Sequence, residues 1–177
     1  MEIDMKINIS ELTVKPIDIS YIPTLLEIQE ETFRHAGGSG DFLRRNTYET
    51  LAPCFEEPSV VLGVFYKEQM IAFGILYAAG QTKENLAYDI DEVTDVRENA
   101  NLKLSIVRPD YRGNGIQQLL IVRLEQSARE SGFKWISVTV SPDNPWSLNN
   151  CKAQGYTEVK RLEKYGGLVR VLLAKKI

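Results

Sequence analysis

Residues 105–117 read Ser-Ile-Val-Arg-Pro-Asp-Tyr-Arg-Gly-Asn-Gly-Ile-Gln, a pattern typical of a strand that turns tightly into a helix. The apolar run 102–107 predicts a buried strand. Apolar residues then recur every three or four positions from Ile116, which predicts a helix that ends before Gly132. Residues 135–140 predict the next strand. Two strands joined by one helix in this way are expected to be parallel, with a right-handed connection.

The residues before this unit predict a strand, two helices and an antiparallel hairpin. We expect a strand over 12–17, a helix from near Pro23, a short helix over 41–51 capped by Asp41, and paired strands over 60–66 and 71–78. Residues 80–101 are polar and weakly periodic, so we interpret them as a long connection that covers or shapes a site.

The residues after the unit predict one more helix and a closing hairpin. Asn144 and Pro145 are typical of a helix cap and first turn, and Gly155 is well placed to end that helix. Residues 156–163 and 168–175 predict the two strands of the hairpin. No linker or internal repeat divides the sequence, so residues 1–177 are expected to form a single domain of mixed α and β structure.

Composition excludes several classes of function. The chain has 177 residues, 44% of them hydrophobic, which is ample for one core. Its apolar runs are far shorter than the ~20 residues that cross a bilayer, so we expect a cytoplasmic protein without a membrane partner. The net charge of −3 and the scattered basic residues argue against nucleic-acid binding. Two cysteines and one histidine lack the spacing of a zinc site, so no metal is expected.

The turn at residues 109–115 is suited to binding a phosphate group. Gly113 and Gly115 permit positive φ angles and leave room for a ligand near the unpaired N–H groups of the following helix, while Arg112 can add a charged contact. The alternative is a plain turn with two glycines. It is not a nucleotide P-loop, since no Gly-Lys-Ser/Thr follows, and Gln118 stands where a dinucleotide-binding fingerprint needs Gly or Ala.

Two motifs together resemble the GCN5-related N-acetyltransferase (GNAT) superfamily. Arg112, Gly115 and Gln117 occupy the positions of its Arg/Gln-x-x-Gly-x-Gly/Ala loop, although Gln117 is larger than the family's Gly or Ala. Asn144-x-x-Ser147-x-x-x-Cys151-x-x-x-Gly155-Tyr156 is similar to a second motif that follows at the expected distance. The resemblance implies a GNAT-like α/β (α+β) fold, with a central mixed, twisted sheet of six or seven strands flanked by four helices.

The resemblance also implies acetyl-CoA as co-substrate and places it on this chain. The backbone of Ser105, Ile106 and Val107 would hold the pantetheine arm, and the Val107 N–H would polarise the thioester carbonyl. The pyrophosphate would lie on Arg112, Gly113, Asn114, Gly115, Ile116 and Gln117. Asn144 would contact the pantetheine or serve only as a helix cap.

The proton-transfer groups are less defined. The family often has a tyrosine as general acid where this chain has Cys151, so Cys151 is the candidate for that role, with inert packing as the alternative. A general base cannot be named. The acids of the polar connection would act through water or are simply solvated charges; they are Asp89, Asp91, Glu92, Asp95 and Glu98.

The expected function is therefore N-acetylation, in which a neutral amine attacks the thioester directly. The acceptor would be a small-molecule amine or a protein N-terminus or lysine. The alternative is an acyl-CoA-binding module with little turnover, which the departures at Gln117 and Cys151 suggest. Similar proteins are often homodimers, and the sequence leaves the oligomeric state open.

Overall fold

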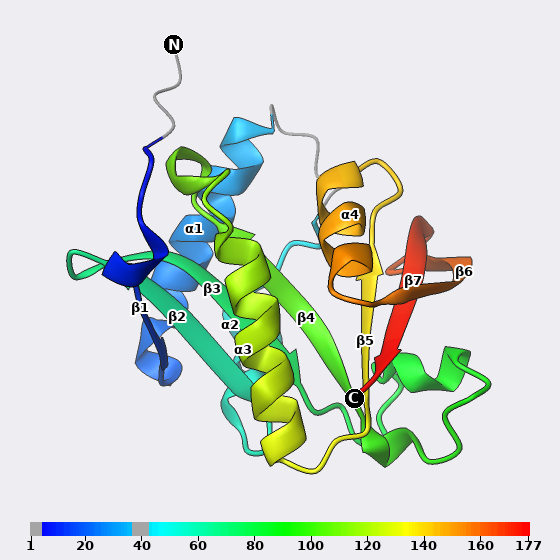
Figure 1. Cartoon of the computed structure of the whole chain (residues 1–177). Coiled ribbons are helices and arrows are strands. Elements are labelled where there is room, and N and C mark those ends of the chain that lie inside the picture. Colours follow the sequence, from blue (N-terminus) through cyan, green and yellow to red (C-terminus); the bar gives the residue numbers. More distant parts are fainter. Residues whose placement is uncertain (1–4, 37–42) are drawn as a thin grey trace.

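Seven strands form one mixed sheet in the order β1-β2-β3-β4-β5-β7-β6 in the computed structural model, which describes residues 5–36 and 43–177 (Figure 1). The strands are β1 (Thr13–Pro16), β2 (Val60–Tyr66), β3 (Gln69–Tyr77), β4 (Asn99–Val107), β5 (Trp135–Val140), β6 (Thr157–Lys164) and β7 (Leu168–Lys176). β4 and β5 run parallel, and the other neighbouring pairs are antiparallel. The predicted mixed sheet, including its parallel pair, is confirmed.

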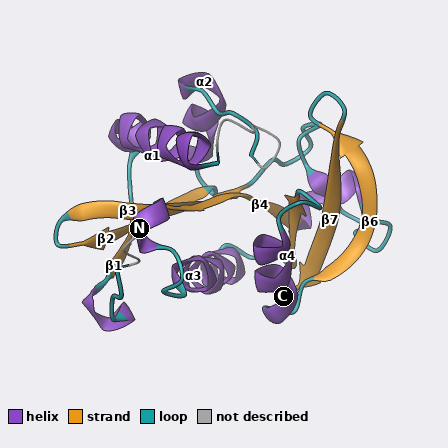
Figure 2. Ribbon diagram, turned by 90° about the horizontal axis from the view of Figure 1, so that it is seen from above, coloured by secondary structure: helices purple, strands orange, loops and turns teal. Residues whose placement is uncertain are grey.

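Four α-helices of the described residues cover the two faces of the sheet (Figure 2). α1 (Ile22–His35) and α2 (Tyr48–Leu51) lie on one face, whereas α3 (Ile116–Glu130) and α4 (Pro145–Ala153) lie on the other. Each face has its own buried cluster of apolar side chains. We call them the α1-side core, which includes Leu25, and the α3-side core, which includes Leu124. No helix in residues 5–36 and 43–177 is long and apolar enough to cross a membrane.

The two parallel strands pair over only a short stretch. Residues 99–101 of β4 pair with residues 135–137 of β5, and β4 continues to Val107 without a partner on that edge. Figure 1 shows the two strands separating beyond this join, towards the N-terminal end of α3. We call this part of the fold, where β4 and β5 are no longer paired, the wedge. Its β4 edge carries backbone groups that the sheet does not use.

A β-bulge changes which side chains of β4 face each layer. Ile75 of β3 pairs with Leu104, whereas Leu76 pairs with Leu102, so Lys103 is an extra residue on β4. Leu102 accordingly packs in the α3-side core and Leu104 in the α1-side core, although a regular strand would place both on one face. The bulge turns Lys103 towards the layer that contains α1 and α2.

The predicted short helix over 41–51 is wrong in its start. Asp41 lies outside the described residues, and α2 begins at Tyr48 after Thr47, whose side chain caps it. The reason is that Gln29 of α1 holds Asn46 in a non-helical conformation. The Asn46 N–H donates to Gln29 Oε1 (2.8 Å), and Gln29 Nε2 donates to the Asn46 carbonyl (3.0 Å).

The predicted start of β4 at residue 102 is also corrected. β4 begins three residues earlier, at Asn99, because the polar residues there are satisfied inside the sheet. Asn99 Nδ2 donates to Ser137 Oγ (2.8 Å), and Asn101 Nδ2 donates to the Glu84 carbonyl (2.8 Å). Asparagine is depleted in strands, so the sequence pattern favoured a connection at this point.

Candidate functional site

The unpaired edge of β4 presents two backbone N–H groups to the wedge. The Arg108 N–H donates to the Ile71 carbonyl of β3 (2.8 Å), which fixes the alternation of the ladder. Ser105 and Val107 therefore direct their N–H groups away from β3. Ile106, predicted to join them, instead directs its N–H to β3 and packs its side chain in the α1-side core. Two of the three predicted residues thus have N–H groups that the sheet does not use.

The turn before α3 offers further donors. Gly113 and Gly115 have φ angles of 78° and 75°, and Gly115 is the N-cap of α3 without a side-chain cap. Within the described residues, the N–H groups of Gly113, Asn114 and Gly115 have no acceptor. A Cβ atom on Gly113 would meet no described atom within 4 Å, so the space above it is open. Such a group of N–H donors at a helix N-terminus can bind an anion, and we call these three residues the anion site.

The Asn114 side chain holds this turn in place. Its Nδ2 donates to the Met5 carbonyl (2.7 Å) and to the Tyr111 carbonyl (2.9 Å), and its Oδ1 accepts from the Ile7 N–H (2.9 Å). The segment before β1 is thereby attached to the turn. The side chain of Asn114 is occupied in structure, while its N–H remains directed to solvent or ligand.

The Gln117 side chain, which departs from the family pattern, points to α4. Gln117 Nε2 donates to Ser147 Oγ (3.3 Å), and Asn150 Nδ2 donates to Gln117 Oε1 (2.5 Å). The larger side chain is therefore used to join α3 to α4. Asn144 caps α4, because its Oδ1 accepts from the Ser147 N–H (3.2 Å). A ligand contact by Asn144 stays a prediction.

Cys151 lies in the α3-side core. It is 4% exposed, and burial raises the pKa of its thiol to about 11. It does not line the cavity described next. This position fits the packing alternative for Cys151 and gives no support to the general-acid role.

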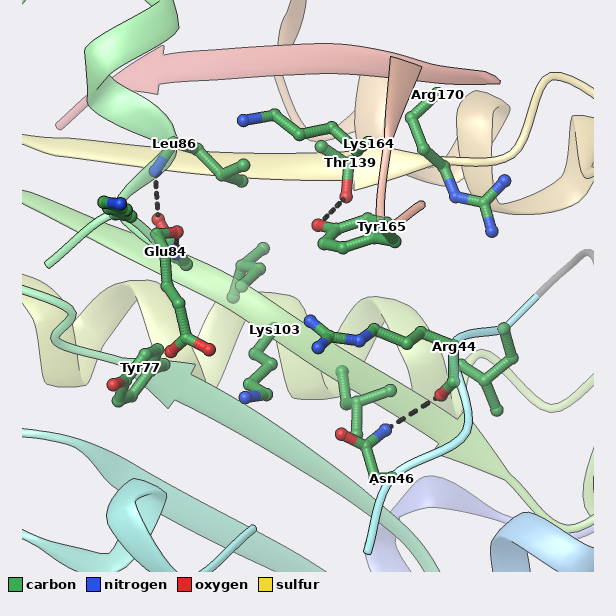
Figure 3. Close-up of a pocket in the computed structure, with 15 residues that line it drawn as sticks. Arg44, Asn46, Tyr77, Glu84, Leu86, Lys103, Thr139, Lys164, Tyr165 and Arg170 are labelled. Atoms are coloured by element: carbon green, nitrogen blue, oxygen red, sulfur yellow. Dashed lines mark hydrogen bonds between the residues drawn. The ribbon is translucent and has the colours of Figure 1, made fainter. Parts of the chain in front are cut away.

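A cavity of about 340 Å³ opens on the α1 side of the wedge (Figure 3). Residues 101–104 of β4 and Thr139 of β5 line it, so it lies where the two strands separate. The turn between β6 and β7 closes another side, where the Tyr165 hydroxyl lies 2.8 Å from Thr139 Oγ1. The wedge thus has unpaired backbone donors along its β4 edge and a cavity beside it.

Glu84 is the acid of this cavity, and sequence reasoning missed it. Its carboxylate lies beside Tyr77 (Figure 3). Burial, followed by the Glu84 charge, raises the pKa of Tyr77 to about 12. Asn101 holds the Glu84 segment, because its Nδ2 donates to the Glu84 carbonyl and its Oδ1 accepts from the Leu86 N–H (3.2 Å).

The acids named from the sequence lie elsewhere. Asp89 pairs with Lys164 (2.7 Å) and Glu98 pairs with Lys134 (2.7 Å). Asp95 pairs with Arg97, whose hydrogen bonds lower the pKa of that carboxyl. The remaining two, Asp91 and Glu92, are exposed and line no part of the cavity.

Comparison with solved structures shows a shared fold. The chain superposes on yncA of Salmonella typhimurium with its cofactor acetyl-CoA (TM-score 0.71, 15% identity, 94% of each chain covered). It also superposes on the ribosomal-protein-S18-alanine N-acetyltransferase of Escherichia coli (TM-score 0.70, 17% identity, 94% of each chain covered). A third similar structure is the paiA N-acetyltransferase of Thermoplasma acidophilum in complex with coenzyme A (TM-score 0.66, 16% identity, 94% of this chain and 99% of that chain covered). A search of curated proteins gives no match.

A sequence model of one family covers most of the chain. The acetyltransferase (GNAT) family matches residues 22–156, which run from the start of α1 through the turn at Gly113 to the end of the α4 motif. The match therefore includes the β4 edge, the anion site and most of the cavity. This chain belongs to the acetyltransferase (GNAT) family.

Proposed function

We propose that this protein transfers an acetyl group from acetyl-CoA to the nitrogen of an amine. One observation carries the proposal: the open β4 edge, with the Ser105 and Val107 N–H groups, lies between the turn at Gly113 and the cavity. A cofactor with a phosphate at one end and a reactive group at the other matches that order. Family membership supports the acetyl group, and the cavity would hold the acceptor.

The residues present fit acetyl-CoA. The N–H groups of Gly113, Asn114 and Gly115 would bind its pyrophosphate, and Arg112 is exposed beside them with its Nε 3.4 Å from the Val107 carbonyl. Because Ser105 and Val107 lie on the strand that leads away from this turn, their backbone would hold the pantetheine arm. When bound, acetyl-CoA supplies an acetyl carbonyl that is activated by its thioester.

The chain's own groups would then assist the transfer. The Val107 N–H would donate to the acetyl oxygen, which gains negative charge as the amine attacks. An ammonium ion must lose a proton before it can attack, and Glu84, which lines the cavity, would accept that proton directly or through a water molecule. Tyr77 would stay protonated beside it, since its pKa is raised to about 12.

Calorimetric titration with acetyl-CoA tests the first part of the proposal. Gly113→Ala should weaken binding by at least about tenfold, because a Cβ would occupy the open space over the turn. Gly132→Ala is the matched control, since Gly132 has φ 83°, an equally open surrounding and a place at the far end of α3. Equal loss in both variants would indicate backbone strain alone and would remove the argument for a phosphate site.

An assay for free thiol with a panel of amines tests transfer. Acetyl-CoA binding without transfer to any amine would instead indicate an acyl-CoA-binding module. The position of Cys151 favours that second candidate, because a thiol buried in the α3-side core leaves the general acid unidentified.

A further inference from the structure

The cavity has the opposite charge to the protein as a whole. The chain has a net charge of −3, yet five basic side chains line the cavity: Arg44, Lys83, Lys103, Lys164 and Arg170. Among its described lining residues, Glu84 is the one acid. A basic cavity in an acidic protein attracts and orients anions.

Three of these cations, Arg44, Lys83 and Lys103, form no ion pair with a described carboxylate. By contrast, Lys164 is neutralised by Asp89 (2.7 Å). Lys103 Nζ contacts the Thr50 carbonyl (3.4 Å) and lies 4.9 Å from the centre of the Tyr77 ring. The guanidinium of Arg44 lies 5.1 Å from the centre of the Tyr165 ring. Figure 3 shows both side chains extending into the same part of the cavity.

The bulge in β4 explains why Lys103 is there. Lys103 is the extra residue opposite Ile75 and Leu76, so it faces the cavity together with Leu104 instead of alternating with it. Side chains turned into a site by a bulge are typical of functional positions. On β7, which pairs with β5, Arg170 adds a further guanidinium; the residue is only 4% exposed, and its Nη1 donates to the Val169 carbonyl (3.0 Å).

We infer that the acceptor is a small amine that also carries an oxyanion, which is either a carboxylate or a phosphate. This inference rests on the proposed acetyl transfer. The oxyanion would bind between Lys103 and Arg44, and the amine would face Glu84. A volume of about 340 Å³ lies at the small end of ligand pockets, which favours a free small molecule over a folded protein.

The reaction of such an acceptor balances as follows. The nitrogen forms a bond to the acetyl carbon, and the bond from that carbon to sulfur breaks. The ammonium nitrogen loses two protons in total: one passes through Glu84 to solvent, and one goes to the departing thiolate. The oxyanion takes no part in these bonds, so its role is binding and orientation.

Matched pairs of amines test the inference. The panel sets each proteinogenic α-amino acid beside its decarboxylated amine, and O-phosphoethanolamine beside ethanolamine. We expect at least one oxyanion-bearing member to exceed its partner by about tenfold or more in kcat/KM. The two kinds of pair separate carboxylate from phosphate recognition.

Charge-removing variants connect that preference to the cavity. Lys103→Met should lower kcat/KM for the best oxyanion-bearing acceptor by about 10- to 100-fold, while kcat/KM for the partner amine without the oxyanion changes by less than about threefold. Arg44→Met should act in the same direction and is less at risk of misfolding, because Arg44 is exposed. Lys160→Met is the control, since Lys160 is exposed on β6 and lines no part of the cavity.

Calorimetry with acetyl-CoA distinguishes failure of the proposed acetyl transfer from failure of the inference about the acceptor. If acetyl-CoA does not bind to the folded protein, the proposed function fails first. If acetyl-CoA binds, a preference for the decarboxylated amines, for ethanolamine or for a C-terminally amidated peptide overturns the inference. The inference is also overturned if no oxyanion-bearing amine is acetylated. It is overturned as well if Lys103→Met and Arg44→Met keep the wild-type preference for the oxyanion-bearing amine.

Discussion

Asn99 donates from its side-chain amide to the Ser137 hydroxyl (2.8 Å), across the only part of β4 that pairs with β5 in the described chain. The same Nδ2 also contacts Asn85 Oδ1 (3.0 Å) and Asn101 Oδ1 (3.2 Å), and all four residues are buried. This polar network fixes the point at which the two strands separate. The wedge therefore begins directly after a stretch in which this network and the buried Ala100 and Ile136 join the two strands.

Asn99→Ala should lower the free energy of unfolding by about 1–3 kcal/mol, because the buried groups of its partners would be left unsatisfied. Urea denaturation measures the change. Asn149→Ala, at an exposed position of α4, should change stability by no more than about 0.5 kcal/mol. A similar small loss in both variants would show that the network contributes little to the join.

Much of the fold could be predicted because local patterns and final structure agree. The glycines of the turn and the three-to-four spacing after Ile116 specify α3, and the turn at residues 165–167 gives the final hairpin, where all three residues have positive φ angles. The short helix could not be placed correctly, since a contact between Gln29 and Asn46, 17 residues apart, decides where it starts. Such a contact leaves no periodic signal.

One part of the candidate site could likewise be predicted from the sequence, and the other could not. The anion site is local in sequence, so the turn at Gly113 could be predicted from its residues. The cavity is assembled from the β4 bulge, the Glu84 segment and the final hairpin. A single extra residue at Lys103 reverses which side chains face the cavity, and neither hydropathy nor spacing shows it. The sequence therefore indicated a cofactor and left the acceptor open.

Glu84→Gln should reduce kcat/KM by about 100-fold at neutral pH, because the amide keeps the shape of the side chain but accepts no proton. Binding of acetyl-CoA should stay unchanged, since Glu84 lies in the cavity and not on the turn. Steady-state kinetics and calorimetry measure the two quantities. Glu92→Gln, an exposed acid on the same connection, serves as control. Full activity of Glu84→Gln would contradict the role of Glu84 as general base and would indicate that solvent accepts the proton.

The pH dependence of activity tests whether Tyr77, which lines the same cavity, ionises in the working range. The pKa of Tyr77 is raised to about 12, mainly by burial, so its hydroxyl should remain protonated throughout the working range of the enzyme. No loss of activity from Tyr77 ionisation is expected below about pH 11. Tyr77→Phe should therefore keep the shape of the pH profile.

Cys151→Ala should leave kcat within about twofold, because a thiol buried in the α3-side core is not placed to protonate a leaving group. Burial raises its pKa from 9.0 to about 11, so folding favours the neutral thiol. The stability that this shift contributes is fully present below pH 9.0 and is lost as the pH rises towards 11. Urea midpoints across this interval should fall less in Cys151→Ala than in the wild type. A loss of kcat near 100-fold with an intact fold would restore the general-acid hypothesis.

Gln117→Ala should separate two explanations of the residue that departs from the GNAT loop pattern. The Gln117 side chain joins α3 to α4 through Ser147 and Asn150, so its removal should lower stability by about 1 kcal/mol. The backbone N–H at the start of α3 is retained, and the Kd for acetyl-CoA should then change by less than about threefold. Gln126→Ala controls for the loss of an exposed glutamine from the same helix. A gain in affinity above about tenfold would mean that the Gln117 side chain obstructs the site, since the ligand would no longer have to displace its hydrogen bonds to α4.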